Sequence, residues 1–187
     1  MLKSVFYRLS KWLRRIYGPR MINYKKNFQN KRIKNLRIGN TTFIDCAENL
    51  VVADNVYIGH HNFIEASNGI DISEGCQITS FISITSHSSH NSVRIYGNNY
   101  SNFQEHHGYQ KGPVKIGKFT FIGPHVTIMP YTSIGDGCIV SAYSYVKGDF
   151  PSYSIIAGNP AKVVGSTKDI DEKILKERPD LEQYYMK

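Results

Sequence analysis

The chain has 187 residues, which fits one folded domain with short appendages and is too small for two large cores. It contains 23 Lys and Arg against 15 Asp and Glu, a formal net charge of +8. Neither an apolar run long enough to cross a bilayer nor a secretory signal with a small-residue cleavage site is evident. The sequence therefore predicts a cytoplasmic protein.

All of the excess positive charge lies in residues 1–37, which contain twelve Lys or Arg and no Asp or Glu. Within the predicted N-terminal segment, residues 1–35, apolar residues recur at helical spacing and predict an amphipathic helix. They are Leu2, Val5, Phe6, Leu9, Trp12, Leu13 and Ile16. We expect residues 1–20 either to lie on an anionic membrane surface as a peripheral contact or to cap the open end of a solenoid. Nucleic-acid binding is disfavoured, because no groove-reading motif or stacking aromatics follow.

Aliphatic residues then recur at a period of six. In the second half of the chain they are Ile116, Ile122, Ile128, Ile134, Val140 and Val146. In the first half they are Ile38, Ile44, Val52, Ile58, Ile64, Ile72, Ile78 and Ile84. The residues two before the later ones are small or β-branched: Thr120, Val126, Thr132, Cys138 and Ser144. A helix repeats at 3.6 residues and a lone strand at 2, whereas a period of six is typical of short strands stacked into a parallel solenoid.

Two steps of the first half, Ile44 to Val52 and Ile64 to Ile72, take eight residues instead of six. One circuit of three sides therefore takes 20 residues there and 18 downstream. We interpret the extra residues as a bulge that always falls at the same corner of a triangular prism. The glycines that follow several aliphatic residues, such as Gly117 and Gly135, are expected to let the backbone turn at corners.

The repeat stops between Ile84 and Val114, and four of the seven histidines fall in this excursion, residues 85–113. They are His87, His90, His106 and His107. A long excursion from a regular coil is usually functional. The 20-residue circuit stacks Ser67 under His87, so we expect residues near Ser67 to hold an imidazole in one tautomer. The candidates are Glu65, Ser67 and Asn68.

The repeats end in the segment from Val146 to Val164, with the sequence VKGDFP followed after three residues by IIAGNPAKVV. Together with the hexads, this ending resembles the left-handed β-helix acyltransferases with hexapeptide repeats, over residues 36–164. The resemblance implies an all-β solenoid, a left-handed parallel β-helix. The residue pattern adds to it the N-terminal amphipathic helix and a short C-terminal helix. That helix lies in residues 165–187, where Thr167 is a plausible N-cap, and is expected to pack back on the prism.

The resemblance also implies where the chemistry lies. A histidine just after the last hexad before the excursion is the general base in that family, and either His87 or His90 fits. His90 is slightly favoured, because the family usually places the base about five residues past the aliphatic, and His90 is six past Ile84. Imidazole suits the removal of a proton from an acceptor that attacks a thioester. His106 and His107, with Glu65 and Asn68, are the candidates for binding the acceptor.

The co-substrate implied by the resemblance is acetyl-CoA, held along the C-terminal coils of a homotrimer whose active sites lie between neighbouring prisms. Backbone donors near the corner and two lysines near the phosphates are the expected contacts. The candidates are Gly123, Ser141, Ala142, Lys147, Asn159 and Lys162. Cys76 and Cys138 occupy inward small positions, so we expect reduced core thiols and not catalytic ones.

The predicted function is an acetyl-CoA-dependent O-acetyltransferase of a sugar hydroxyl in surface polysaccharide biosynthesis, with an acceptor free or carried on a lipid or nucleotide. One alternative is N-acetylation of a nucleotide-linked amino sugar, whose enzymes often add a nucleotide-binding βαβ unit. A serine acetyltransferase is disfavoured, because that enzyme carries a large helical N-terminal domain and the segment before the hexads here is short. A non-catalytic membrane-associated scaffold has no need of the histidine-bearing excursion. A metal site like that of the γ-class carbonic anhydrases would use His87, His90 and His125, but the GNPAK ending favours an acyltransferase.

Overall fold

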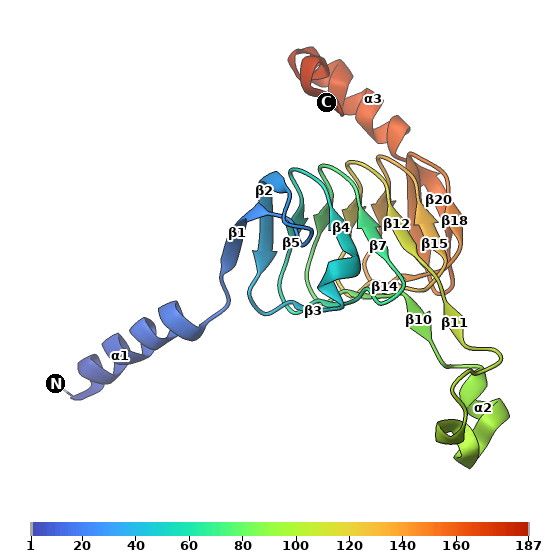
Figure 1. Cartoon of the computed structure of the whole chain (residues 1–187). Helices are drawn as coiled ribbons and strands as arrows, with labels where there is room; N and C mark the ends of the chain where they lie inside the picture. The colour runs from blue at the N-terminus through green and yellow to red at the C-terminus, as the bar shows by residue number, and fades with distance from the viewer. Residues whose placement is uncertain (1, 187) are drawn as a thin grey trace.

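The computed structural model describes residues 2–186, with the side chains of residues 2–4, 14 and 16 outside the description. The chain forms a prism of stacked coils with a helix leaving each end and an excursion projecting from one corner (Figure 1). Within the predicted apolar stripe of the N-terminal helix, the side chains of Leu2 and Ile16 therefore lie outside the described residues.

Three sheets of parallel strands make the sides of the prism. The first sheet contains β2 (Arg32–Gly39), β5 (Tyr57–Ile58), β8 (Gln77–Ile78), β13 (Phe121–Ile122), β16 (Ile139–Val140) and β19 (Ser154–Gly158). The second contains β3 (Phe43–Asp45), β6 (Phe63–Glu65), β9 (Ser83–Thr85), β14 (Thr127–Ile128) and β17 (Tyr145–Val146). The third contains β4 (Leu50–Val52), β7 (Ile70–Ile72), β12 (Val114–Ile116), β15 (Thr132–Ile134) and β18 (Asp149–Phe150). The predicted parallel solenoid is confirmed.

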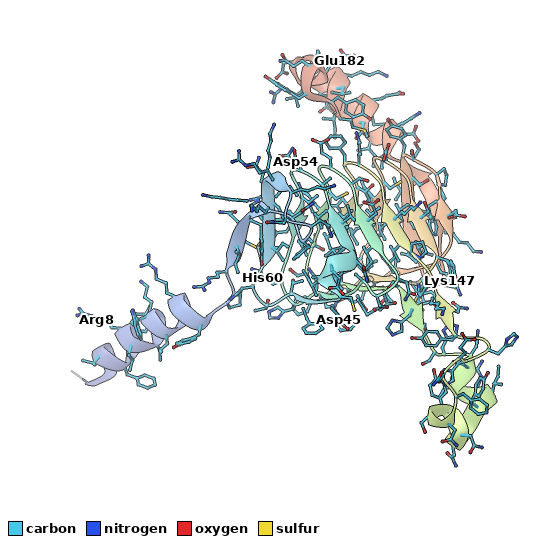
Figure 2. All side chains as sticks on the ribbon, viewed as in Figure 1. Arg8, Asp45, Asp54, His60, Lys147 and Glu182 are labelled. Atoms are coloured by element: carbon cyan, nitrogen blue, oxygen red, sulfur yellow. The ribbon has the colours of Figure 1, made fainter. Side chains whose placement is uncertain are left out.

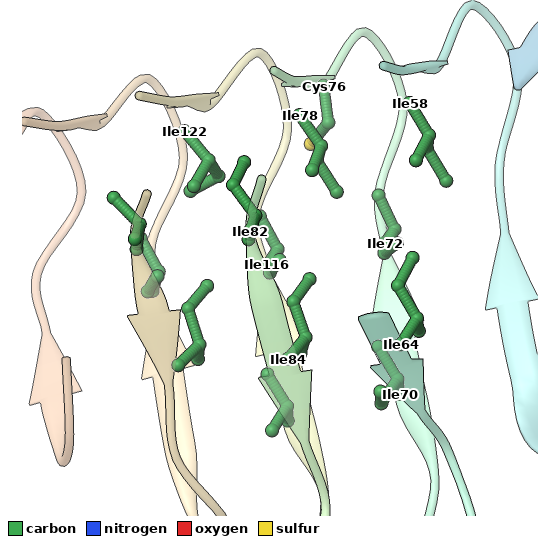
Figure 3. Packing of buried hydrophobic residues seen from close by; sticks show 14 of the residues in the cluster. Ile58, Ile64, Ile70, Ile72, Cys76, Ile78, Ile82, Ile84, Ile116 and Ile122 are labelled. Carbon is green, nitrogen blue, oxygen red and sulfur yellow. The ribbon is translucent and has the colours of Figure 1, made fainter. Parts of the chain in front are cut away.

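Strand register places the hexad residues directly above one another. In the first sheet Ile38 pairs with Ile58, Ile58 with Ile78, and Ile78 with Ile122. The same stacking joins Ile64 to Ile84 in the second sheet. Figure 3 shows Ile58, Ile64, Ile78, Ile84 and Ile122 in the interior of the prism, where all five are completely buried. Burial of each such side chain contributes about 1.5–3 kcal/mol, so the ladder of aliphatic residues supplies the stability of the solenoid.

The glycines after the aliphatic residues do not serve the purpose predicted for them. A Cβ on Gly117 would lie 2.4 Å from the carbonyl carbon of Gly135, and one on Gly123 would lie 2.7 Å from the amide nitrogen of Ala142. Glycine is therefore needed because successive coils approach closely. The left-handed backbone at the corners is adopted instead mainly by asparagine and aromatic residues, among them Asn55, His61, Phe81, Phe119, His125, Tyr131, Tyr143 and Tyr153.

The extra residues of successive coils fall at one corner, between the second and third sheets, which we call the site corner. The first coil places the short 3₁₀ helix η1 (Ala47–Asn49) there, and the second places a turn at residues 67–69. The third coil places the whole excursion there. Its elements are β10 (His87–Ser88), α2 (Ser92–Tyr96), the 3₁₀ helix η2 (Gly97–Asn102) and β11 (Gln110–Lys111). The predicted common corner is confirmed, and the excursion grows from it on an antiparallel β10–β11 stem.

The N-terminal segment contains a strand that the sequence analysis did not predict. Strand β1 (Met21–Lys26) pairs antiparallel with β2 and covers the open edge of the first sheet. Helix α1 (Leu2–Tyr17) stands away from the prism (Figure 1). The edge of the first coil is thus covered by β1, and α1 does not cap the coil of its own chain.

At the other end, β20 (Ala161–Ser166) pairs antiparallel with β19 and leads into α3 (Thr167–Glu177) and the 3₁₀ helix η3 (Pro179–Tyr184). The N-cap is Ser166, whose Oγ accepts a hydrogen bond from the amide of Lys168, and not the predicted Thr167. Ile170 and Ile174 are 42% and 49% exposed. The helix therefore extends away from the prism (Figure 1), and the described C-terminal segment contacts the last coil only at the start of α3, where Lys168 lies over the Tyr153 ring, and near the chain end, where Met186 lies beside Gly137. No described helix is long and apolar enough to span a membrane.

Candidate active site

His87 stands at the site corner, two residues after β9 ends at Thr85. It opens the stem of the excursion, because it pairs across the stem with Lys111. Its side chain is 38% exposed. The regular coil fixes the backbone before this histidine and the stem fixes the backbone after it, so the imidazole is both held and accessible.

A carboxylate from the coil below contacts this imidazole. Glu65 Oε2 lies 2.7 Å from Nδ1 of His87, and the Glu65 side chain is only 4% exposed. Ser67 Oγ lies 3.2 Å from the same nitrogen. An ionised carboxylate can only accept hydrogen bonds, so Nδ1 carries the proton, and the lone pair of the neutral ring is on Nε2. The stacking of Ser67 beneath His87, predicted from the circuit length, is confirmed.

Glu65 is buried but well supplied with donors. Its carboxylate accepts hydrogen bonds from the amide of Ser67 at 2.8 Å and from the amide and hydroxyl of Ser86 at 3.1 and 3.0 Å. Burial alone raises the pKa of the Glu65 carboxyl, but the hydrogen bonds from Ser67 and Ser86 outweigh it and lower that pKa below its usual value. Glu65 is therefore ionised at neutral pH, as its contact with His87 requires.

Asn68 supports the same network from behind. Its amide nitrogen donates to Ser86 Oγ at 2.9 Å, and its side-chain Nδ2 donates to Ser67 Oγ at 2.9 Å. Glu65 and Asn68 are thus in contact with the residues around the imidazole. Their contacts fit the predicted role of holding the ring better than that of binding an acceptor.

His90 has different surroundings. It is exposed, and Nδ1 contacts only the Ser88 hydroxyl, at 2.8 Å. Its backbone carbonyl accepts a hydrogen bond from the Arg94 guanidinium. No described carboxylate contacts its ring. The spacing from Ile84 slightly favoured His90, whereas the contacts favour His87.

Aromatic rings extend the site from His87 into the excursion. Tyr109 stacks on His87 with ring centroids 5.6 Å apart and an interplanar angle of 19°. Beyond it, His106 stacks on Tyr100 with centroids 3.7 Å apart, and its Nε2 contacts the Tyr100 carbonyl at 2.7 Å. A hollow of about 460 Å³ opens beside these rings. It is lined by Tyr100, Gln104, Glu105, His106, Tyr109 and Lys111.

The two predicted acceptor-binding histidines, His106 and His107, have different surroundings. His106 lines the hollow, whereas His107 is exposed and its amide donates to the Tyr96 hydroxyl at 2.7 Å. His107 does not line the hollow.

A larger hollow, of about 850 Å³, lies on the β1–β2 hairpin and is lined mainly by polar and basic side chains such as Lys34 and Arg37. It contains no histidine, carboxylate or thiol, and it is remote from the site corner.

Most of the predicted cofactor residues lie at another corner, between the first and second sheets. Gly123 and Ala142 are stacked there, and Gly158 donates from its amide to Ser144 Oγ at 3.2 Å, which brings neighbouring Asn159 to the same corner. The amides of Gly123 and Ser141 already donate to the carbonyls of the next coil. They are therefore not the free donors that were expected, and Ala142 is the exposed residue of the three predicted corner contacts.

The two lysines predicted to bind phosphate lie in different parts of the fold. Lys147 lies at the site corner near the excursion stem (Figure 2), and its Nζ donates to Gln110 Oε1 at 2.9 Å. Lys162 is exposed on β20, at the edge of the first sheet. Within one chain, the structure brings together Glu65, Ser67, Asn68 and His87, places Lys147 beside the stem, and leaves the remaining cofactor candidates across the width of the second sheet.

Three contact residues of the site were not predicted from the sequence. Ser86 is a donor to Glu65, Tyr109 packs on His87, and Gln110 holds Lys147. Ser86 was detectable in principle, because it follows β9 as Ala66 follows β6 in the coil below. Tyr109 and Gln110 carry no such signal, because an irregular excursion has no period to place them.

The histidines needed for the metal alternative do not converge within the chain. His125 stacks between Phe81 and Tyr143, with centroids 5.0 and 4.7 Å away, at the corner opposite His87 across the second sheet. Asp45, Cys46 and Glu65 do bring potential ligand atoms within 4.8 Å of one another. Glu65 is already saturated by Ser67, Ser86 and His87. Burial and the nearby Asp45 and Glu48 raise the pKa of the Cys46 thiol.

The two thiols in the core, Cys76 and Cys138, are held in the protonated form. Cys76 is fully buried, and burial raises the pKa of its thiol to about 11. Cys138 is also buried, and burial raises the pKa of its thiol. Thiolates, not thiols, are nucleophiles. Among the described residues, His87 is the histidine whose ring contacts a carboxylate, which gives it the form of an acid–base site.

Comparison with known proteins agrees with this architecture. The family of bacterial transferase hexapeptide repeats (six repeats) matches residues 113–148. A Staphylococcus aureus (strain Mu50) protein provisionally named an acetyltransferase is 43% identical over 63 residues, which are 33% of this chain and 32% of that protein. A "Probable acetyltransferase" of Mycobacterium tuberculosis is 47% identical over 57 residues, 30% of this chain and 19% of its own. The chain thus spans about a third or less of the length of these curated relatives.

Solved structures share the fold over more of the chain. A maltose O-acetyltransferase from Clostridium difficile has a TM-score of 0.60 and 23% identity, covering 73% of this chain and 67% of its own. AntD, an N-acyltransferase from Bacillus cereus solved with dTDP and 3-hydroxybutyryl-CoA, has a TM-score of 0.51 and 19% identity, covering 78% of this chain and 89% of its own. The chain therefore carries hexapeptide repeats folded as a parallel β-helix, for which these neighbours imply left-handed winding.

Proposed function

We propose that this protein is an acetyl-CoA-dependent O-acetyltransferase that modifies a sugar hydroxyl, with His87 as the general base. The single observation that carries the proposal is the contact between Glu65 and Nδ1 of His87. A buried carboxylate that holds one nitrogen of an accessible imidazole leaves the other nitrogen free to accept a proton from an acceptor. This arrangement stands where the regular coil gives way to an aromatic-lined hollow large enough for a sugar ring.

In the proposed reaction, Nε2 of His87 removes the proton of the acceptor hydroxyl as its oxygen attacks the thioester carbonyl carbon. The new C–O ester bond forms, the C–S bond breaks, and the CoA thiolate leaves and takes up the proton from Nε2. Glu65 stabilises the imidazolium that exists between these proton transfers. No covalent acyl-enzyme is needed, because a thioester is already activated and alignment of the two reactants lowers the barrier.

Tyr109 and His106 are proposed to bind the acceptor. An aromatic face packs well against the apolar face of a sugar, and the imidazole of His106 adds a polar group beside it. The sugar class is supported by the shared fold of a maltose O-acetyltransferase. Placement of acetyl-CoA is proposed from the GNPAK ending, with Ala142 and Asn159 along the pantetheine, and Lys147 or Lys162 near the phosphates.

The two groups of proposed contacts lie at different corners of one prism, which supports a homotrimer in which adjacent chains complete each site. The excursion also exposes apolar side chains, with Val93, Ile95 and Phe103 at 50%, 65% and 50% exposure. A second chain packed against the excursion would bury them. A biosynthetic role in surface polysaccharides at the inner face of the membrane follows from this substrate class and remains part of the proposal.

The test is a product assay with the full chain, acetyl-CoA and a panel of acceptors that includes maltose, galactosides, cell-surface glycans and a nucleotide-linked amino sugar. We expect thiol release coupled to transfer of one acetyl group, detected by mass spectrometry, and an ester that hydroxylamine cleaves. A hydroxylamine-resistant amide would establish N-acetylation instead, a candidate kept because AntD shares the fold. Absence of both acetyl-CoA binding and transfer would support the scaffold alternative.

A further inference from the structure

Helix α1 separates its side chains into two faces. Each residue advances about 100° around a helix, so Val5, Phe6, Trp12 and Leu13 all lie within about 60° of Leu9. The basic residues Arg8, Lys11 and Arg15 lie about 100° or more from Leu9, on the other side. The described helix therefore has one apolar face and one basic face, with no acidic residue on either.

The apolar face is not covered by the rest of the chain. Phe6 is 75% exposed, Trp12 57% and Leu9 50%. Val5 and Leu13 are 61% and 40% exposed. Isolated exposed apolar side chains are common, but a contiguous apolar face along a whole helix marks a surface that binds something.

Asn40 holds the connection between α1 and β1. Its side-chain Oδ1 accepts from the Arg20 amide at 2.8 Å, its amide donates to the Arg20 carbonyl at 3.0 Å, and its Nδ2 donates to the Gly18 carbonyl at 3.3 Å. The connection from α1 to β1 is short and pinned at both residues. Strand β1 pairs with β2, so the edge of β2 is covered by β1 and not by the helix.

We propose that α1 docks on an anionic lipid surface, with its apolar face inserted at the headgroup boundary and its basic face toward the phosphates. The charge pattern points to this occupant: residues 1–37 hold twelve Lys or Arg and no acid, while the rest of the chain is net negative. No ion pair involving Arg8, Lys11 or Arg15 is present among the described residues, so these cations are available to phosphate groups. Apolar insertion and attraction to anionic headgroups are the two contributions on which an interfacial helix depends.

Trp12 is the only tryptophan of the chain and lies on the proposed inserting face, which makes it a reporter of docking. The experiment titrates the full chain with vesicles of equal parts phosphatidylcholine and phosphatidylglycerol and records Trp12 fluorescence. We expect a blue shift, quenching by lipids brominated on the acyl chain, and reversal by salt. Pure phosphatidylcholine vesicles should give much weaker binding. No shift or quenching with the anionic vesicles would overturn the proposal.

Two matched pairs of variants locate the binding face. Lys11→Gln with Arg15→Gln should weaken vesicle binding about 30-fold, because each basic residue near an anionic surface strengthens binding about fivefold. Lys173→Gln with Lys176→Gln removes the same charge from exposed positions of α3 and should leave binding unchanged. Equal weakening by both pairs would show attraction by net charge alone and would overturn docking through α1.

The apolar contribution is tested by cosedimentation with the same vesicles. Phe6→Ser with Leu9→Ser should weaken binding at least tenfold, whereas Ile170→Ser with Ile174→Ser, exposed on α3, should not. The rival occupant is α1 of other copies. A Trp12 blue shift that appears without lipid, grows with protein concentration and blocks vesicle binding would show that copies of the helix cover one another, and would contradict the lipid proposal.

Discussion

Glu65 and His87 lie on successive coils at the site corner, where the 2.7 Å contact between Oε2 and Nδ1 fixes the imidazole proton. Nε2 of His87 has no hydrogen bond to any described residue, and the side chain is 38% exposed. His90, three residues on, lacks a carboxylate partner among the described residues. The contact thus separates two histidines that look alike in sequence, and it makes the assignment testable.

We predict that His87→Ala lowers kcat by roughly 10²–10⁴-fold with little change in acetyl-CoA affinity, because the lost function is proton transfer. His90→Ala is the matched control and should change kcat only slightly. Steady-state kinetics and calorimetric titration of acetyl-CoA measure the two quantities. The reverse pattern would assign the base to His90, and full activity in both variants would exclude this loop as its source.

The lowered pKa of Glu65 has a consequence for acid stability. The folded carboxyl binds its proton more weakly than the unfolded one, whose ordinary value is 4.5. Its stabilising contribution is therefore complete above that value and is lost as the pH falls through the lower pKa of the folded state. Glu65→Gln should cost about 1.5–3 kcal/mol of unfolding free energy at pH 7, because buried donors lose a charged acceptor.

The measurement for Glu65 is urea unfolding of both proteins from pH 7 to pH 3. The difference in unfolding free energy between wild type and Glu65→Gln should shrink only in the acidic part of this range. A difference that stays constant with pH would mean that the carboxylate is not responsible. Glu65→Ala is unsuitable here, since it also leaves a cavity.

For the co-substrate, Lys147→Ala combined with Lys162→Ala should raise the Kd for CoA at least tenfold, because each removes a proposed charge-assisted bond to phosphate. Lys115→Ala removes one charge from an outward position on β12 and should leave the Kd unchanged. Isothermal titration calorimetry is the assay. An unaltered Kd in the double variant would show that the phosphates lie elsewhere.

Truncation of one side chain in the stacked aliphatic core should lower the free energy of unfolding strongly. Ile84 is fully buried between Ile64 and Ile128 on adjacent coils, so Ile84→Ala should lower the unfolding free energy by about 2–5 kcal/mol. Ser83→Ala, the neighbouring outward position, should stay within about 0.5 kcal/mol. Urea midpoints at constant m-value measure both. A minor loss for Ile84→Ala would mean that the coil relaxes to close the cavity.

The exposed apolar side chains of the excursion predict a homotrimer. Multi-angle light scattering should give three copies for the wild type, and Ile95→Glu should dissociate them by placing a charge in the buried contact. Ile174→Glu introduces the same charge on exposed α3 and should leave the trimer intact. A wild-type monomer at micromolar concentration would contradict this prediction.

The sequence by itself determined the solenoid, its coil length and the common corner of the two-residue bulges. This was possible because each short side contributes one inward aliphatic residue, as the stacking of Ile58 on Ile38 illustrates, so that a local period reports a global stack. It also placed Ser67 under His87, since a fixed circuit length converts residue number into position. The apolar spacing near the N-terminus is also a local pattern. It predicted the helix, but it did not predict strand β1 or which surface the helix contacts.

Tertiary structure alone decided which histidine meets a carboxylate, because that depends on how the β10–β11 stem turns His87 over Glu65 and carries His90 outward. It also decided that Tyr109 packs on the imidazole, since the excursion has no repeat to place it. The prediction that Gly117 lets the backbone turn was wrong, because this position is constrained by the backbone of the next coil and not by the local turn. Contacts across coils and along an aperiodic loop arise from chain geometry, which no spacing within one strand encodes.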